Sequence, residues 1–103
     1  MGRLFKVAEI KDLPSKTAMA AKVEGRTVAL FNVDGTLYAI DDTCTHEGGP
    51  LSEGEVDGTI VTCPWHGACF DLTTGEVLEP PAAERVARYE VRVEGDDVKI
   101  EIP

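Results

Sequence analysis

The chain has 103 residues, a length typical of one domain with a modest hydrophobic core. Hydrophobic residues make up 43% and charged residues 28%, which is ordinary for a globular protein and excludes a disordered or low-complexity chain. The formal net charge of −9 argues against nucleic acid and anionic membranes as partners, because both require basic patches, and it favours a partner with a basic surface.

The amino terminus and the cysteine count predict a cytoplasmic protein. The start, MGRLFKVAEI, contains no long apolar run, so we expect neither a signal peptide nor a transmembrane segment. Three cysteines are an odd number, whereas the disulfide framework of a secreted protein usually needs an even one. We therefore expect Cys44, Cys63 and Cys69 to be thiols in a reducing compartment.

Short strands and turns dominate the first forty residues. A short apolar run at 4–7 is followed by apolar stretches at 17–23 and 27–33, which are separated by Glu24-Gly25. Asp34-Gly35 is a strong hairpin signal, and 37–40 is the expected return strand. Residues 16–40 are thus predicted to form a three-stranded antiparallel meander.

The composition changes between residues 41 and 73, where glycines and prolines are frequent. Strands are predicted here at 59–62, which runs directly into Cys63, and at 69–72. Residues 82–88 are the best helical candidate, although they are few. Alternation at 87–93, with Tyr89, Val91 and Val93 on one face, and at 98–102 predicts a closing hairpin.

These elements predict an all-β class in a single domain spanning 1–103. We expect an antiparallel β-sandwich or barrel base formed by 1–40 and 74–103. A glycine-rich subdomain at about 41–73 is inserted into that base.

Two short stretches contain both histidines of the chain and two of its three cysteines: CTHEGGP at 44–50 and CPWHGACF at 63–70. Cys44 and His46 lie two positions apart, Cys63 and His66 lie three apart, and sixteen residues separate the two pairs. Side chains at i and i+2 of an extended loop project to the same side, and those at i and i+3 of a tight turn do so as well. The two stretches can therefore direct four ligands at one point.

Two thiolates and two imidazoles suit zinc, and they also suit a [2Fe–2S] cluster in which two histidines replace two cysteines on one iron. Zinc sites usually pair cysteine with cysteine and histidine with histidine. Here each pair is mixed, which favours the cluster over zinc.

The two stretches closely resemble the motif of the Rieske family, which is Cys-x-His, about sixteen residues, then Cys-x-x-His. The resemblance covers nearly the whole chain and implies a Rieske-like fold. It also implies that Cys44 and Cys63 bind the buried iron, and that His46 and His66 bind the outer iron near the surface. The segment EPPAAE at 79–84 resembles the family's proline-containing loop beside the cluster.

The chain differs from one branch of the Rieske family at four positions, which indicates the branch that it resembles more closely. Rieske proteins of respiratory and photosynthetic cytochrome complexes have two further cysteines in a disulfide, and serine and tyrosine hydroxyls that donate hydrogen bonds to sulfur. The corresponding positions here are Gly49, Trp65, Ala68 and Phe70. Hydrogen bonds to sulfur stabilise the reduced cluster, so their absence predicts a low potential and a soluble ferredoxin.

The chain most resembles the ferredoxin component of aromatic-ring dioxygenase systems. The resemblance implies a one-electron carrier between a flavoprotein reductase and a terminal oxygenase, with transfer through the His46/His66 edge. No histidine remains for a mononuclear iron site or a catalytic triad, so we predict a carrier and not an enzyme. The alternatives are the Rieske-like small subunit of an assimilatory nitrite reductase and a zinc-stabilised binding module.

Several other residues allow two interpretations. Cys69 is predicted to be a small buried side chain, with redox sensing as the alternative. Trp65 is predicted to shield the cluster side of its loop, with partner contact as the alternative. Glu47, Glu53 and Glu55 form either a solvated loop or a docking rim for a basic partner.

Overall fold

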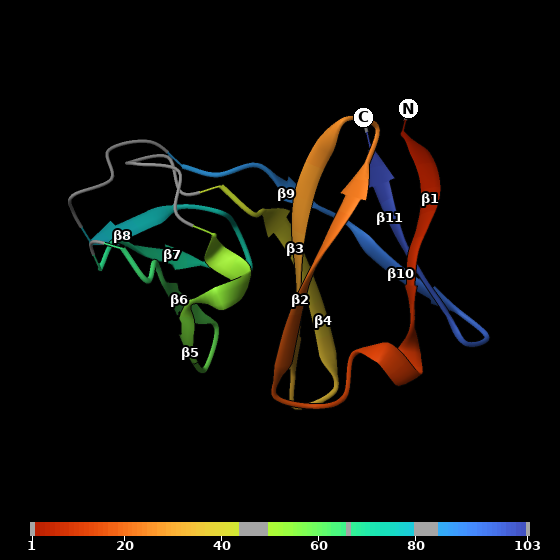
Figure 1. The fold of residues 1–103 in the computed structure, drawn as a ribbon, viewed down its shortest axis with the longest axis horizontal. Coiled ribbons are helices and arrows are strands. Elements are labelled where there is room, and N and C mark those ends of the chain that lie inside the picture. Colours follow the sequence, from red (N-terminus) through yellow and green to blue (C-terminus); the bar gives the residue numbers. More distant parts are fainter. Residues whose placement is uncertain (1, 44–49, 66, 80–84, 103) are drawn as a thin grey trace.

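The structure, a computed structural model, describes residues 2–43, 50–65, 67–79 and 85–102. These residues form three antiparallel sheets (Figure 1). The first sheet has the order β1 (Arg3–Glu9), β11 (Asp97–Ile102), β10 (Val91–Glu94). The middle sheet has the order β2 (Thr17–Val23), β3 (Arg26–Val33), β4 (Thr36–Asp41), β9 (Arg88–Tyr89). The third has the order β5 (Glu55–Asp57), β6 (Ile60–Thr62), β7 (Cys69–Asp71), β8 (Val77–Glu79).

Two short 3-10 helices complete the described elements: η1 (Ile10–Asp12) and η2 (Leu51–Glu53). The predicted all-β class and antiparallel arrangement are confirmed. No helix in the described part of the chain is long and apolar enough to cross a membrane.

The predicted meander at 16–40 is confirmed as β2, β3 and β4 in consecutive antiparallel pairing. Both connecting turns place two residues at positive φ, as two-residue hairpin loops of this kind require. The φ angles are 51° and 78° at Glu24 and Gly25, and 51° and 95° at Asp34 and Gly35. Local turn chemistry therefore sets this part of the register.

The single strand predicted at 87–93 is interrupted at Glu90, because its two halves join different sheets. Tyr89 in β9 pairs with Ala39 of β4, whereas Val91 in β10 pairs with Ile100 of β11. The predicted buried face also ends early, since Val93 is 49% exposed. The helical candidate at 82–88 lies partly outside the described residues, and its last residue, Arg88, begins β9.

Strand β3 of the middle sheet is buried on both faces. Val28 and Leu30 of β3 contact a core shared with the first sheet, where Val98 and Ile100 lie. Ala29 and Phe31 of the same strand point the other way, into a second core shared with the third sheet. Burial on both faces explains why β3 has a continuous apolar run in place of simple alternation.

The second core joins the third sheet to the middle one. It contains Phe31, Val61, Phe70 and Leu72, all at most 1% exposed. Figure 1 shows the resulting three layers, with β5–β8 on one side of β2–β4 and β1, β10 and β11 on the other. The third sheet spans residues 55–79. The predicted division into a base of 1–40 and 74–103 and a subdomain at about 41–73 remains a prediction.

Candidate metal centre

One of the four predicted ligands, Cys63, lies among the described residues. Cys44, His46 and His66 lie outside them. The same holds for Glu47, Gly49 and most of the predicted proline-containing loop, residues 80–84. Within the described residues, no group of three or more histidine, cysteine, aspartate or glutamate side chains could hold a metal ion. The predicted ligand set therefore stays a prediction, and the structure describes only Cys63 and the segments that flank the other three residues.

Cys63 lies at the start of a tight turn between β6 and β7. Its backbone N–H donates to the Ala68 carbonyl at 2.7 Å, and its own carbonyl accepts from the Gly67 N–H at 3.1 Å. Gly67 has φ of 79°, a conformation that glycine adopts without steric cost. The two hydrogen bonds close residues 63–68 into a compact turn, so the backbone that carries Cys63 is held from both ends.

The surroundings of Cys63 are apolar. The residue is 3% exposed and belongs to the second core, together with the fully buried Leu51, Ala68 and Phe70. Iron–sulfur clusters are held by cysteine sulfur, and an apolar shell around such a ligand limits the access of solvent to it. A sulfur donor in a dry apolar shell thus fits an iron–sulfur cluster. Ala68 and Phe70 contribute no hydroxyl group to this shell.

The segment containing Cys44 and His46 is fastened at both of its ends. Thr43 pairs with Pro50 in an isolated β-bridge. The Leu51 N–H donates to the Asp42 carbonyl at 2.6 Å, and the Ser52 N–H donates to Asp42 Oδ1 at 2.7 Å. These contacts bring Asp42 and Thr43, on one side of the segment, close to Pro50, Leu51 and Ser52 on the other.

The residues that follow 80–84 in the chain are held by hydrogen bonds to the end of β4. The Asp41 N–H donates to the Ala87 carbonyl at 2.9 Å. The Tyr89 hydroxyl donates to Asp41 Oδ1 at 2.5 Å and accepts from Arg26 at 3.0 Å. Burial raises the pKa of Tyr89, and the hydrogen bond to Asp41 raises it further. The end of β4 therefore anchors two parts of the chain: residues 50–52 through Asp42, and residues 87–89 through Asp41.

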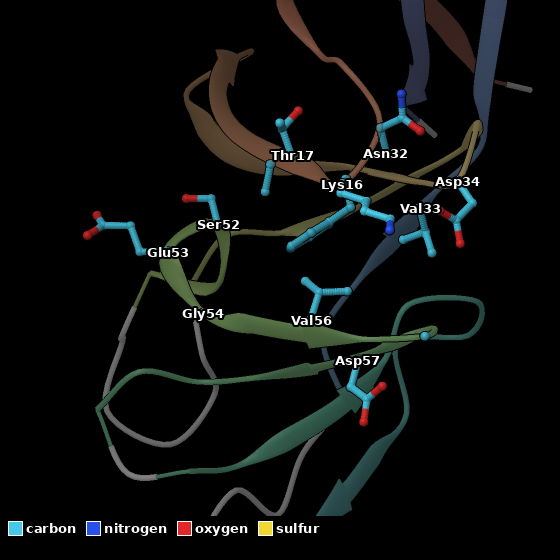
Figure 2. A pocket seen from close by; sticks show the side chains of 13 residues that line it. Lys16, Thr17, Asn32, Val33, Asp34, Ser52, Glu53, Gly54, Val56 and Asp57 are labelled. Atoms are coloured by element: carbon cyan, nitrogen blue, oxygen red, sulfur yellow. The ribbon is translucent and has the colours of Figure 1, made fainter.

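The prediction for Cys69 was wrong. It was predicted to be buried, but it is only partly buried, and its Sγ lies 3.3 Å from Thr62 Oγ1. The reason is strand alternation: Phe70 takes the core side of β7, so its neighbour points to the opposite face. Trp65 is 55% exposed, which leaves much of its side chain available to a partner. Glu53, which Figure 2 labels at the end of η2, and Glu55 are exposed.

Asp42 and Tyr89 are site-supporting residues that the sequence did not single out. Asp41-Asp42 reads as an ordinary polar loop entry, and Tyr89 reads as one position of an alternating strand. No spacing or composition signal distinguishes them, because their roles depend on contacts with residues 10 and 48 positions away.

Comparison with known proteins identifies the family. The model of the Rieske [2Fe-2S] domain matches residues 3–90. The chain belongs to this Rieske family. Its cofactor is accordingly a [2Fe–2S] cluster, and the zinc alternative is set aside.

Relatives of this Rieske chain are ferredoxins. It is 39% identical over 104 residues to the 3-phenylpropionate/cinnamic acid dioxygenase ferredoxin subunit of Escherichia coli (strain K12), covering 100% of this chain and 96% of that protein. It is similar to the Sphingomonas yanoikuyae B1 ferredoxin, with a TM-score of 0.90 and 31% identity over 98% of this chain and 100% of that one.

A third relative is the ferredoxin in a complex of reduced oxygenase and oxidized ferredoxin of carbazole 1,9a-dioxygenase. The TM-score is 0.86 and the identity 33%, over 94% of this chain and 91% of that one. The relatives are electron-transfer proteins, so this Rieske protein is an electron carrier and not a catalytic enzyme. A nitrite reductase small subunit from Mycobacterium tuberculosis shares the fold, with a TM-score of 0.87, but only 22% identity, which supports no common function.

Proposed function

We propose that Cys44 and Cys63 bind the inner iron of the [2Fe–2S] cluster, and that His46 and His66 bind the outer iron. The motif spacing and the burial of Cys63 at the start of a closed turn support this assignment. When bound, the cluster supplies a site that accepts and releases one electron. The protein's part is to hold the two loops, to exclude water from the sulfur side and to leave the histidine side accessible.

Ligand substitutions test the assignment directly. We expect Cys44→Ser, Cys63→Ser, His46→Ala and His66→Ala each to lose the Rieske electron paramagnetic resonance signal and much of the bound iron and sulfide. Cys69→Ser is the matched control, since Cys69 lies six residues after Cys63 on the outer face of β7. It should retain wild-type iron, sulfide and spectrum. Retention of the signal in any of the four ligand variants would refute the assignment of that residue.

We propose further that the protein is cytoplasmic and carries electrons from a flavoprotein reductase to the terminal oxygenase of an aromatic-ring dioxygenase system. The observation that carries this proposal is the similarity, over its whole length, to a dioxygenase ferredoxin subunit. The similarity to a ferredoxin in complex with its oxygenase supports the same partner class.

The surroundings of Cys63 suit this place in an electron-transfer chain. Ala68 and Phe70 are fully buried and have no hydroxyl group to donate to a sulfur atom. Rieske potentials range from about −150 to +300 mV, and fewer hydrogen bonds to sulfur place a cluster lower in that range. Voltammetry on the purified protein should give a potential near the bottom of the range. A value hundreds of millivolts higher would contradict the proposed role.

The charge distribution supports a basic partner. Residues 27–84 contain eleven acidic residues and neither lysine nor arginine. The rest of the chain has ten basic and eight acidic residues, so the negative charge is concentrated in the segment that carries the cluster motif. Such a field steers a basic surface toward that segment and makes the association rate dependent on salt.

Reconstitution tests the carrier role. Purified protein is combined with NADH and with the reductase and oxygenase components of the E. coli 3-phenylpropionate system. We expect substrate oxidation that requires the ferredoxin and that slows as salt rises. Glu53→Lys/Glu55→Lys should weaken both the rate and its salt dependence, whereas Glu24→Lys, in the exposed turn between β2 and β3, should change neither. Absence of electron transfer to the oxygenase from a fully loaded, reducible protein would contradict the proposed partner.

A further inference from the structure

A cleft opens between the middle sheet and the third sheet, where β5 faces the ends of β2 and β3 (Figure 2). Its volume is about 490 Å³, within the range of about 300–1,000 Å³ that is typical of ligand-binding pockets. The described residues that line it are 16–18, 31–34, 52–54 and 56–58. The cleft therefore lies where the second core, which joins these two layers, gives way to solvent.

The walls of the cleft are apolar. Val56 belongs to the row of β5 and β6 side chains that faces the second core, because it pairs with the fully buried Val61. It is nevertheless 40% exposed, since the cleft separates β5 from the middle sheet at this point. On the opposite wall, Ala18 and Val33 are partly buried, and Figure 2 shows Val33 directed toward β5 and Val56 directed toward the middle sheet. An apolar group that entered the cleft would bury surface that the fold itself leaves in contact with water.

Acidic residues lie at both ends of the cleft. Glu53 is at one end, and Asp34 and Asp57 are at the other (Figure 2), and all three are exposed. Among the described residues that line the cleft, Lys16 is the one cation, so three acidic residues against one lysine leave a net charge of −2. The exposed Glu55 lies between β5 residues of the cleft and Glu53 in the sequence, and it extends the same acidic surface. The local charge thus favours a cation over an anion.

An apolar cleft with acidic ends matches the side chain of a lysine or an arginine. Such a side chain buries its aliphatic stem along apolar surface and keeps its charged end beside carboxylates and water. The sequence between residues 27 and 84 has neither lysine nor arginine, so this part of the chain supplies no such group of its own. A protein partner with a basic surface supplies it, and the acidic field of this chain steers that surface toward the cleft.

We propose that this cleft is a docking site for a lysine or arginine side chain of a redox partner. The inference rests on the proposed function and deepens it, because it names the place where the basic partner is held. None of the residues that line the cleft is a proposed ligand of the cluster. Its part is therefore to hold and orient the partner, and not to conduct the electron.

A charge-neutral substitution tests whether the cleft itself is occupied. Ala18→Leu fills the cleft, and Ala20→Leu is the matched control, because Ala20 is an exposed residue on the same face of β2 that does not line the cleft. The readout is the KM for this protein of the reductase and of the oxygenase of the E. coli 3-phenylpropionate system. We expect Ala18→Leu to raise at least one of the two KM values several-fold with kcat unchanged, and Ala20→Leu to leave both at wild type.

A second neutral variant covers the case in which Ala18→Leu does not fold, as judged by circular dichroism. Val56→Thr keeps the shape of the side chain and removes its apolar contact with the occupant. Val93→Thr is its control, since Val93 is 49% exposed at the edge of the first sheet, away from the cleft. We expect the Val56 variant to raise the same KM and the Val93 variant to leave it unchanged.

Charge substitutions test whether the occupant is a cation, because two of them should act in opposite directions. Asp57→Asn should raise the KM, whereas Lys16→Gln should lower it by removing a cation that competes for the cleft. Each effect should be about two- to fivefold at low salt, as is usual for partly exposed ion pairs. Asp96→Asn and Lys22→Gln remove the same charges at exposed positions outside the cleft, so they measure the effect of net charge alone. We expect each cleft variant to exceed its control.

The outcomes separate this proposal from the proposed function. The proposal is overturned if the neutral cleft variants change both KM values no more than their controls do. It is also overturned if the neutral variants act but the charge variants do not exceed theirs, which would indicate an apolar occupant. Iron content and reduction potential should equal wild type in every variant, so that a changed KM reports docking. Failure of the proposed function would appear differently, because the wild-type protein itself would not pass electrons to the oxygenase.

Discussion

Gly54→Ala adds one methyl group at the joint between η2 and the third sheet. Gly54 has φ of −79°, which alanine adopts readily, so the backbone conformation itself is no obstacle. The new Cβ would overlap the Thr62 carbonyl oxygen and lie 3.1 Å from the Thr62 carbonyl carbon and 3.2 Å from the Leu51 carbonyl oxygen. All of these are backbone atoms, so no side-chain rotation relieves the contact. Thr62 directly precedes Cys63, and its displacement would move the proposed ligand.

The expected cost follows from these contacts. Forcing a methyl group into a packed site costs about 1–3 kcal/mol, and a lost backbone hydrogen bond between β5 and β6 adds about 1 kcal/mol. We therefore expect Gly54→Ala to destabilise the fold by about 2–4 kcal/mol. Gly58→Ala is the matched control, because Gly58 lies in the β5–β6 turn at φ of 61° with nothing within 4 Å of an added Cβ. Its left-handed conformation costs about 1–2 kcal/mol, which a stiffer unfolded chain partly offsets, so about 1 kcal/mol remains.

Two measurements decide between the variants. Urea denaturation followed by circular dichroism gives the free energy of unfolding, and chelator challenge gives the rate of iron release. Gly54→Ala should be the less stable variant and should release iron faster, whereas Gly58→Ala should release iron at the wild-type rate. If the Gly58 variant proved the less stable, or if both released iron equally, backbone contact at Gly54 would not be what positions Cys63.

Three further predictions follow from the described contacts. Ala68→Ser places a hydroxyl beside Cys63. A hydroxyl that donates a hydrogen bond to sulfur should raise the reduction potential, measured by voltammetry, by about 40 mV for each kcal/mol by which it stabilises the reduced state. An unchanged potential would mean that the hydroxyl does not reach sulfur. Phe70→Ala removes a fully buried ring from the second core and should cost about 3–5 kcal/mol in urea denaturation, whereas the partly buried Phe5→Ala should cost less. Burial raises the pKa of Tyr89, so the neutral hydroxyl is the form that the fold favours, and its contribution to stability is intact below about pH 10 and lost as pH rises through the raised pKa. Tyr89→Phe should therefore cost about 1–2 kcal/mol at neutral pH and flatten the alkaline part of a stability–pH profile, and an unchanged profile would contradict the role of this hydroxyl.

Much of this protein was predictable from local signals in its sequence. Asp34-Gly35 and Glu24-Gly25 determine the β2–β3–β4 meander, because their positive φ angles fit a tight turn between antiparallel strands. The two Cys–His stretches and their spacing predicted an iron–sulfur site, and the family is confirmed. Both kinds of signal are carried by residues close together in the chain.

The features that escaped prediction depend on contacts between distant residues. β5 and β8 have three residues each, EVD and VLE, too few to show a period, and they exist because β6 and β7 offer edges to pair with. Tyr89 and Val91 join different sheets because two separate partners compete for one stretch of chain. Cys69 faces outward because Phe70 occupies the core side of β7.

Asp42 shows the same division most clearly. The sequence does not single this residue out, yet it is buried, and its carboxylate accepts a hydrogen bond from the Ser52 N–H of η2. Turn geometry and ligand spacing depend on residues that are near one another in the sequence, so the sequence predicts them. Burial is decided only when segments that are distant in the sequence pack against one another, so the burial of Asp42 was decided by the tertiary structure.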